Sequence, residues 1–182
     1  MHRPAEPKIV GSNPAPHLSM TTKIIWVDSE DRVIGSASRD AVNGIYRVSA
    51  LWITNNQGKI LLARRALSKS HNPGKWGPAV AGTVEEGETY ESNILKEAEE
   101  ELGLKKIHPK KGPKTRTYGE HQFFCQWFTT TVKKPLNQFK IQKAEVEEIK
   151  WFSKEELMQQ IQEKPSEFLE GITEWMKQFE KT

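Results

Sequence analysis

Short apolar runs separated by polar turn residues dominate the first two thirds of the chain. Residues 23–29, 76–84 and 146–152 each contain one such run, which predicts three separate strands. Residues 46–65 contain two runs around the turn sequence Asn-Asn-Gln-Gly, which predicts a β-hairpin. Residues 115–132 predict a further pair of strands. The pattern therefore indicates a β-sheet as the centre of the fold.

One segment between the strands has the periodicity of an α-helix instead. Leu95, Ala98 and Leu102 recur at helical spacing within residues 89–102. Gly103 follows directly and supplies the residue type that most readily ends a helix in the left-handed conformation. We expect the three apolar residues to face the core and the glutamates of this helix to lie on the other side.

Two further helices are predicted close to the C-terminus. In residues 153–162, Ser153 is a candidate N-cap with Glu156 three residues later, as in a capping box. Residues 165–179 carry an apolar stripe that is typical of a helix packed on a core. The stripe consists of Phe168, Leu169, Ile172, Trp175, Met176 and Phe179. The elements together predict an α/β fold with a mixed β-sheet, in a single domain at residues 21–182.

The composition narrows the class of protein. The chain has 182 residues, of which 36% are hydrophobic and 28% charged, and no apolar run approaches the ~18 residues that span a bilayer. A net charge of +3 is too small to argue for a nucleic-acid partner. Residues 1–20 contain four of the ten prolines and predict a flexible leader. Cys125 is the only cysteine, which excludes an internal disulfide and favours the cytoplasm. The sequence neither predicts nor excludes a homodimer.

The acidic content of the predicted helix points to metal chemistry. Successive residues of a helix are turned by ~100°, so Glu97, Glu100 and Glu101 share one side of it. Oxygen ligands suit a hard cation such as Mg²⁺ or Mn²⁺. Gly82 and Gly87 permit a tight preceding loop in which a backbone carbonyl approaches the same ion. The alternative is an acidic helix face that is simply solvated.

The spacing of these residues resembles the Nudix box. That pattern has a glycine, a glutamate after five residues, and an Arg-Glu pair followed by Glu-Glu and a further glycine. The matching residues in this sequence are Gly82, Glu88, Lys96, Glu97, Glu100, Glu101 and Gly103. Lysine at position 96 stands where the family has arginine.

The resemblance implies a Nudix α/β/α sandwich and a hydrolase of diphosphate bonds. It implies a divalent ion, Mg²⁺ or Mn²⁺, held by Gly82, Glu97, Glu100 and Glu101. The substrate expected is a small molecule, a nucleoside diphosphate derivative or a related organic diphosphate. Glu100 and Glu101 are the candidate catalytic residues, with Glu100 as the proton acceptor.

The resemblance also concerns residues around the metal ligands. Glu88 and Lys96 are secondary candidates, with Glu88 expected to support the loop. Lysine keeps the positive charge of arginine but loses the planar fork that can hold two carboxylates at once. We therefore expect Lys96 to give a looser metal site.

Residues 61–88 resemble the isopentenyl-diphosphate isomerase-like branch of the family. In that branch the residues at the positions of Arg65 and Lys69 contact a diphosphate. The alternative, to which the sequence gives equal weight, is that both are simply exposed basic residues on a loop. The residues that the isomerase reaction needs are missing. Val80 or Ala81 stands in place of a cysteine, Tyr46 and Thr83 in place of histidines, and Phe123 in place of a glutamate. The hydrolase is thus favoured, with an isomerase or a non-catalytic diphosphate-binding module as alternatives.

Other polar residues carry weaker signals. Glu120 lies near a predicted strand end, where it is either an additional metal ligand or base, or a surface residue. The basic residues 105–116 are interpreted as a solvated loop, because they lack interleaved aromatic residues. The histidines at 71, 108 and 121 have no ligand spacing, which argues against zinc.

Overall fold

A computed structural model describes residues 22–179, so the leader predicted for residues 1–20 lies outside the described part. The described residues form nine strands and three α-helices, with short 3₁₀ turns between some of them. The strands are β1 (Lys23–Val27), β2 (Val33–Ser38), β3 (Ile45–Thr54), β4 (Ile60–Arg65), β5 (Trp76–Pro78), β6 (Val80–Thr83), β7 (Lys110–Thr117), β8 (Phe123–Thr131) and β9 (Val146–Phe152). The helices are α1 (Tyr90–Leu102), α2 (Lys154–Glu163) and α3 (Ile172–Phe179).

Strand β3 is the centre of the sheet. One of its edges pairs in parallel with β8 from Tyr46 to Thr54. Its other edge pairs antiparallel with β1, then with β6 and finally with β4 as the strand continues. Both strand directions therefore occur in one sheet, as the sequence predicted.

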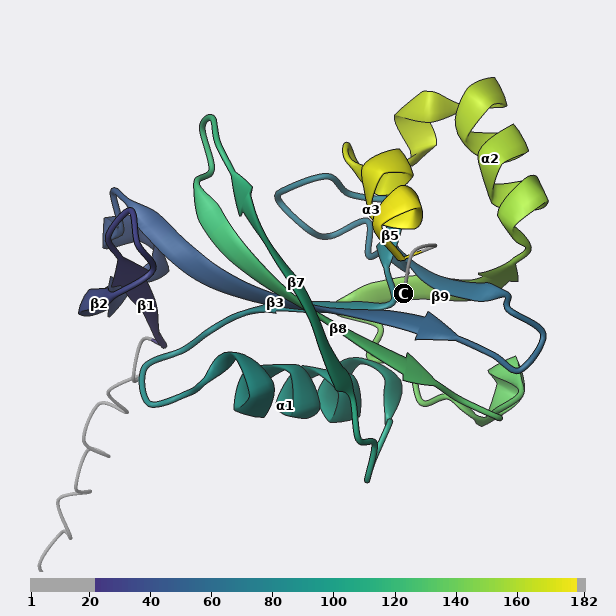
Figure 1. The fold of residues 1–182 in the computed structure, drawn as a ribbon, viewed down its shortest axis with the longest axis horizontal. Coiled ribbons are helices and arrows are strands. Elements are labelled where there is room, and N and C mark those ends of the chain that lie inside the picture. Colours follow the sequence, from purple (N-terminus) through teal and green to yellow (C-terminus); the bar gives the residue numbers. More distant parts are fainter. Residues whose placement is uncertain (1–21, 180–182) are drawn as a thin grey trace, which may run out of the picture.

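Helices cover both faces of this sheet (Figure 1), with α1 on one side and α2 and α3 on the other. Alternate residues of β3 point to opposite faces, as in any strand. Leu51 and Ile53 pack in the core beneath α1, whereas Ala50 and Trp52 pack in the core beneath α2 and α3. The architecture is the α/β/α sandwich expected from the sequence. Within residues 22–179, no helix has the length and apolar content needed to cross a bilayer.

Helix α1 ends at the glycine that the sequence analysis predicted and starts at an N-cap, Thr89, that it did not identify. The Thr89 hydroxyl accepts a hydrogen bond from the Ser92 backbone N–H, and the Ser92 hydroxyl lies 2.9 Å from the Thr89 nitrogen. These two bonds satisfy donors that the first helical turn leaves free. Gly103 takes the left-handed conformation, with φ of 64°, and ends the helix.

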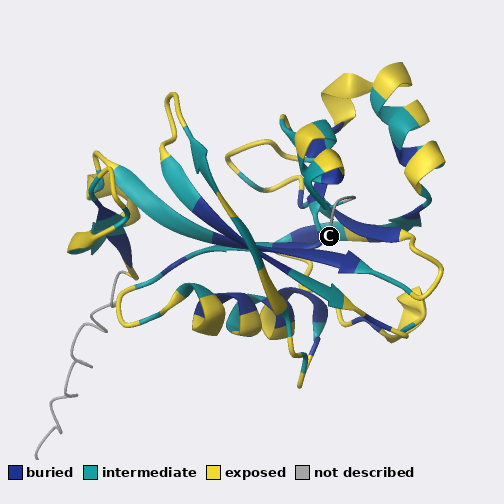
Figure 2. Cartoon of the chain, in the orientation of Figure 1, coloured by how far each residue is buried: buried dark blue, intermediate teal, exposed yellow. Residues whose placement is uncertain are grey.

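The orientation of α1 differs from the prediction. Leu95 is 37% exposed, and Ile94 is fully buried in its place. The buried side of α1 also includes Asn93 and Glu101, so Glu101 does not lie opposite the core, whereas Glu100 does. Figure 2 shows this division, with the outward side of α1 exposed and its sheet-facing side buried. The prediction failed because it counted apolar residues alone, whereas two polar residues occupy the sheet-facing side.

The strands depart from the prediction in three regions. Strand β2 was not expected, since it lies at the sheet edge, pairs only with β1 and has no buried residue. Residues 76–84 form two strands rather than one, because β5 pairs with β4 and β6 pairs with β3. Strand β7 begins at Lys110, so the basic residues 105–116 are a loop only in their first part.

Near the C-terminus, α2 agrees with the prediction and α3 is shorter. The Ser153 hydroxyl accepts a hydrogen bond from the Glu156 backbone N–H at 3.0 Å, which caps α2. A 3₁₀ turn at Pro165–Glu167 and then Gly171, with φ of 88°, precede α3. The helix therefore begins only at Ile172, although Phe168, Ile172 and Met176 of the predicted stripe are buried together.

Candidate active site

Glu97 lies against the backbone of β6. A Cβ atom added to Gly82 would fall 2.4 Å from the Cγ and Cδ atoms of Glu97, which is far inside van der Waals contact. Position 82 therefore requires glycine for steric reasons, independently of backbone conformation. The close approach places the Glu97 carboxyl group beside the strand that the sequence suggested for a metal-binding carbonyl.

Glu101 is one helical turn further along α1 and is more deeply buried. Only 8% of the residue is exposed. Burial, followed by the charges of Glu97 and Glu145, raises the pKa of Glu101 to about 8. The Ala81 backbone N–H and the Lys69 charge oppose this rise without cancelling it.

The pKa of Glu97 is shifted in the same direction. Burial raises the pKa of Glu97 to about 7; Lys96 acts against this shift, and the charge of Glu100 adds to it. The raised pKa values of these two neighbouring carboxyl groups show that burial and nearby carboxylates disfavour their ionised forms and that the Lys96 and Lys69 charges do not fully offset this. Such groups titrate as a coupled pair rather than independently.

Lys96 supplies the one ammonium group that contacts several of these carboxylates. Its Nζ atom lies 2.7 Å from Glu88, 3.0 Å from Glu85 and 3.8 Å from Glu97. Burial would lower the pKa of Lys96, but the hydrogen bonds to Glu88 and Glu85 outweigh burial and raise it. Lysine at this position thus bridges acidic residues of the loop and the helix, and Glu85 is a partner that the sequence analysis did not identify.

Asn93 is a second residue that the sequence analysis missed. It is fully buried, and its side-chain amide donates to the Glu88 carboxylate at 2.8 Å and to the Thr83 carbonyl at 3.1 Å. Its amide oxygen accepts a hydrogen bond from the Ser49 hydroxyl. The available signal was its position four residues before Glu97, which places both side chains on the same side of the helix.

Glu88 has every feature of a supporting residue. Its carboxylate accepts hydrogen bonds from Lys96, from Asn93 and from the Glu85 backbone N–H, the last at 2.9 Å. Burial would raise the pKa of Glu88, but these partners together lower it. The carboxylate is therefore held ionised within the loop that leads into α1.

The remaining acidic candidates are exposed. Glu100 is on the solvent side of α1, although its charge contributes to the raised pKa of Glu97. Glu120 lies in the turn between β7 and β8 and is exposed. Of the acidic candidates from the sequence, the structure therefore places Glu97 and Glu101 together on the sheet-facing side of α1, with Glu100 at its border.

The two basic candidates occupy the end of β4 and the loop after it. The Arg65 Nε atom donates to the His71 carbonyl at 3.0 Å, so this side chain fastens the loop between β4 and β5. The Lys69 Nζ atom lies 2.5 Å from the Glu145 carboxylate. Because the charge of Lys69 acts on Glu101, Lys69 is the basic candidate that the structure relates to the acidic group.

The donor set is compatible with a hard divalent cation. Within residues 22–179, no group of three or more His, Cys, Asp or Glu side chains is already arranged to hold a metal ion. Mg²⁺ commonly binds through one or two carboxylates and completes its coordination with water and substrate phosphates. Glu97 and Glu101 are two adjoining carboxyl groups whose ionised forms a bound cation would stabilise, so they meet that requirement.

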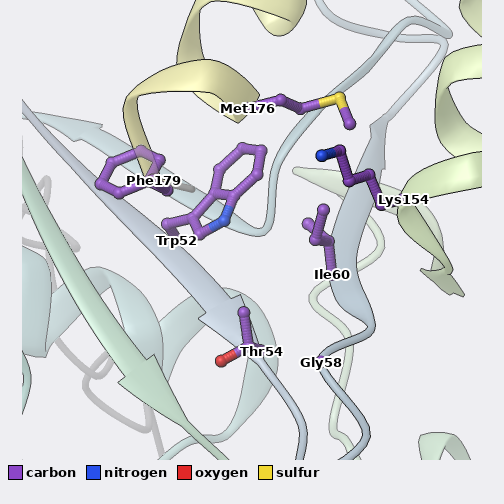
Figure 3. A pocket seen from close by; sticks show the side chains of 7 residues that line it. All are labelled: Trp52, Thr54, Gly58, Ile60, Lys154, Met176 and Phe179. Atoms are coloured by element: carbon purple, nitrogen blue, oxygen red, sulfur yellow. The ribbon is translucent and has the colours of Figure 1, made fainter. Parts of the chain in front are cut away.

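A shallow cavity of about 210 Å³ lies on the opposite face of the sheet (Figure 3). It is bordered by the stacked rings of Trp52 and Phe179, whose centroids are 5.1 Å apart. Trp52 belongs to the core beneath α3, and only 3% of this residue is exposed. The acidic residues of α1 face the other side of β3, so this cavity is separate from the candidate active site.

Comparison with known proteins agrees with the geometry. A model of the NUDIX domain matches residues 45–175, which include the whole candidate site. The chain belongs to the Nudix hydrolase family. An uncharacterized Nudix hydrolase of Yersinia pestis is 28% identical over 160 residues, covering 82% of this chain and 83% of that protein. Nudix proteins generally use a divalent metal ion.

Two further comparisons concern the branch and the fold of this Nudix protein. An isopentenyl-diphosphate Delta-isomerase of Klebsiella pneumoniae is 30% identical over 95 residues, covering 47% of this chain and 52% of that enzyme. The crystal structure of DR0079 from Deinococcus radiodurans superimposes with a TM-score of 0.71 at 22% identity, covering 85% of this chain and 97% of that one. The second likeness supports the Nudix fold.

Proposed function

We propose that this Nudix protein is a Mg²⁺-dependent hydrolase that cleaves the diphosphate bond of a nucleoside diphosphate derivative or a related organic diphosphate. The observation that carries the proposal is the pairing of Glu97 with Glu101 on the sheet-facing side of α1, where their charge is incompletely neutralised. Mn²⁺ has the same ligand preference and is expected to replace Mg²⁺. The single cysteine, Cys125, is consistent with a cytoplasmic protein.

Each residue of the group has a role in this proposal. Glu97 and Glu101 hold the ion, and the bare Gly82 backbone leaves room for them. The bound ion would neutralise phosphate oxygens and lower the pKa of a coordinated water. Glu100, which is exposed and beside Glu97, is the proposed proton acceptor. Arg65 and Lys69 are the proposed cationic contacts of the substrate.

An isomerase of prenyl diphosphates is the second candidate, because a segment of this chain is similar to such an enzyme. The residues at the positions named above argue against it. Cys125, the one cysteine, is buried in β8, and burial raises its pKa, so it is poorly suited to proton transfer. We therefore retain hydrolysis as the leading proposal.

A substrate screen tests the proposal directly. Nucleotide sugars, dinucleotides, nucleoside triphosphates and prenyl diphosphates are incubated with Mg²⁺ and either the wild type, Glu101→Gln or Glu99→Gln. Glu99 is exposed and pairs with Lys105, which makes it the matched control on the same helix. We expect metal-dependent phosphate or monophosphate release that falls at least ~100-fold in Glu101→Gln, equivalent to ~2.7 kcal/mol in the barrier.

Two outcomes would overturn the hydrolase. Isomerised prenyl diphosphate without hydrolysis would establish the second candidate. Tight binding of a diphosphate with no turnover of any compound would establish a non-catalytic binding module. A Glu101→Gln variant as active as the wild type would refute the assigned role of this residue.

A further inference from the structure

Lys69 and Glu145 form an ion pair that joins two separate segments beside the candidate active site. The Lys69 Nζ atom and the Glu145 carboxylate are 2.5 Å apart, and the two side chains are 30% and 35% exposed. Lys69 belongs to the loop between β4 and β5, and Glu145 directly precedes β9. Seventy-six positions separate them along the chain, so the contact exists only in the folded protein.

Backbone hydrogen bonds hold both partners in place. The Ala66 N–H donates to the Glu145 carbonyl at 2.9 Å, and the Lys69 N–H donates to the Ala66 carbonyl at 3.1 Å. On the other side, the Glu145 N–H donates to the Gln142 carbonyl, and the Gln142 N–H donates to the Glu101 carbonyl, each at 2.9 Å. The backbone at Lys69 is therefore connected, through Glu145, to the end of α1 that carries Glu101.

The pair also acts electrostatically on the acidic group. The charge of Glu145 raises the pKa of Glu101, and the charge of Lys69 lowers it. Both charges are thus close enough to a proposed metal ligand to be felt there. Under the proposed function, a phosphate group is an alternative partner for Lys69. The divalent ion that Glu101 would hold is an alternative partner for Glu145, whose charge acts on Glu101.

We propose that the Lys69–Glu145 ion pair is a latch that couples binding of the divalent ion to binding of the diphosphate. In the free protein each side chain neutralises the other. A diphosphate must take Lys69 away from Glu145, and a cation must take Glu145 away from Lys69. The free-energy cost of breaking the ion pair is met by whichever ligand binds first, so the second ligand binds more tightly. Thermodynamic linkage requires that the ion and the diphosphate strengthen each other's binding by the same factor.

The latch rests on the proposed function, but it makes a distinct prediction. A cation and an anion that share a site attract each other in any variant, so coupling alone does not identify a latch. A latch instead predicts gains of affinity when one partner is removed. A salt bridge that only fastened the loop would give losses or no change, because its removal would loosen both sites.

Calorimetric titration with Mn²⁺ and with methylenediphosphonate, a diphosphate analogue that resists hydrolysis, separates these cases. In Glu145→Gln we expect methylenediphosphonate alone to bind at least ~5-fold more tightly, because Lys69 is released. In Lys69→Met we expect Mn²⁺ alone to bind more tightly by a similar factor. In the wild type each ligand should tighten the other, within the ~5–150-fold range of allosteric couplings, and both variants should reduce that factor.

Controls keep the outcome interpretable. Lys69→Arg retains the charge and should retain the coupling. Lys143→Met removes a nearby ammonium group, which donates to the Glu147 backbone carbonyl, and Glu147→Gln removes a nearby carboxylate that takes no part in this bond. Both variants should leave both affinities unchanged. Thermal melting checks that each variant is folded.

The two proposals fail in different ways. Unchanged or weaker binding of each single ligand in folded Glu145→Gln and Lys69→Met would overturn the latch, even if Glu101→Gln abolished hydrolysis. Binding of a diphosphate with no turnover of any compound by the wild type would overturn the proposed function. The affinity gains would then support the latch as a property of binding alone.

Discussion

Gly82 and Glu97 touch so closely that any larger residue at position 82 would displace the Glu97 side chain. The 2.4 Å separation between a Cβ atom at Gly82 and the Glu97 side chain leaves no room even for a methyl group. The glycine at the start of the Nudix box is thus explained in this protein by side-chain packing. A strand residue and a helix residue fit together, and the carboxylate is positioned by that fit.

Gly82→Ala should therefore displace Glu97 and damage both stability and activity. Overpacking of this kind typically costs 1–3 kcal/mol. We expect a loss of about that size in urea denaturation, together with weaker Mn²⁺ binding. In the double variant Gly82→Ala/Glu97→Ala the clash is removed, so the alanine at 82 should cost little stability there. Equal costs in the two backgrounds would contradict the steric explanation.

The metal-free protein should become less stable as pH rises from about 4.5 to 8. The pKa values of Glu97 and Glu101 are about 7 and about 8 in the folded state, against an ordinary value of 4.5. In this window the folded protein retains protons that the unfolded chain releases, so the free energy of unfolding falls with increasing pH. Melting temperatures in a chelator at pH 5.5 and pH 8.5 measure the effect.

Substitution at one of these carboxyl groups should flatten this pH dependence. Glu101→Gln cannot ionise at that position, and its melting temperature should exceed that of the wild type at pH 8.5. Glu99→Gln, on the exposed side of α1, should keep the wild-type slope. Saturating Mg²⁺ should raise the wild-type melting temperature most at high pH. A melting temperature that did not change between the two pH values would contradict the prediction.

Lys96 should be important for stability because one ammonium group contacts three carboxylates. Lys96→Met leaves Glu85, Glu88 and Glu97 without that cation, and we expect a loss of ~1–3 kcal/mol at neutral pH. Lys105→Met removes an exposed ion pair with Glu99 and should cost less than ~0.5 kcal/mol. Chemical denaturation compares the two, and similar losses would show that Lys96 is an ordinary surface lysine.

Asn93 should influence catalysis without contacting the substrate. Asn93→Ala removes the amide that connects Ser49, Thr83 and Glu88, leaving buried polar groups unpaired at ~1–3 kcal/mol. Loss of a group that orients metal ligands typically reduces activity or metal affinity ~10–100-fold. If Ser49 and Asn93 act as a unit, Ser49→Ala/Asn93→Ala should cost less than the sum of the single variants. Additive losses would contradict their coupling.

Local signals in the sequence were sufficient for much of the fold. Gly103, identified from the sequence, ends α1, and Thr89, which the sequence analysis did not identify, caps its start; both caps depend on adjacent residues only. The hairpin around Asn-Asn-Gln-Gly appears as β3 and β4 for the same reason. The assignment to the Nudix family followed from spacing along one loop and one helix, which is also a local property.

Features that depend on distant contacts could not be predicted in this way. The burial of Asn93 follows from its hydrogen bond to Ser49 on another strand, and the division of residues 76–84 follows from two different pairing partners. Likewise, nothing in the sequence indicates that Lys69 and Glu145 form an ion pair. Apolar periodicity predicted that Leu95 faces the core, because this criterion assumes that only apolar residues are buried.

Strand β3 provides no acidic residue, yet it limits how this domain can diverge. Ser49 and Trp52 point to opposite faces of the sheet. Inserting or deleting one residue between them would move the side chains of the following strand residues to the opposite face. Loops such as residues 66–75 can change length and chemistry at much lower cost. New substrate preferences should therefore arise by remodelling those loops, while the length of this strand stays fixed.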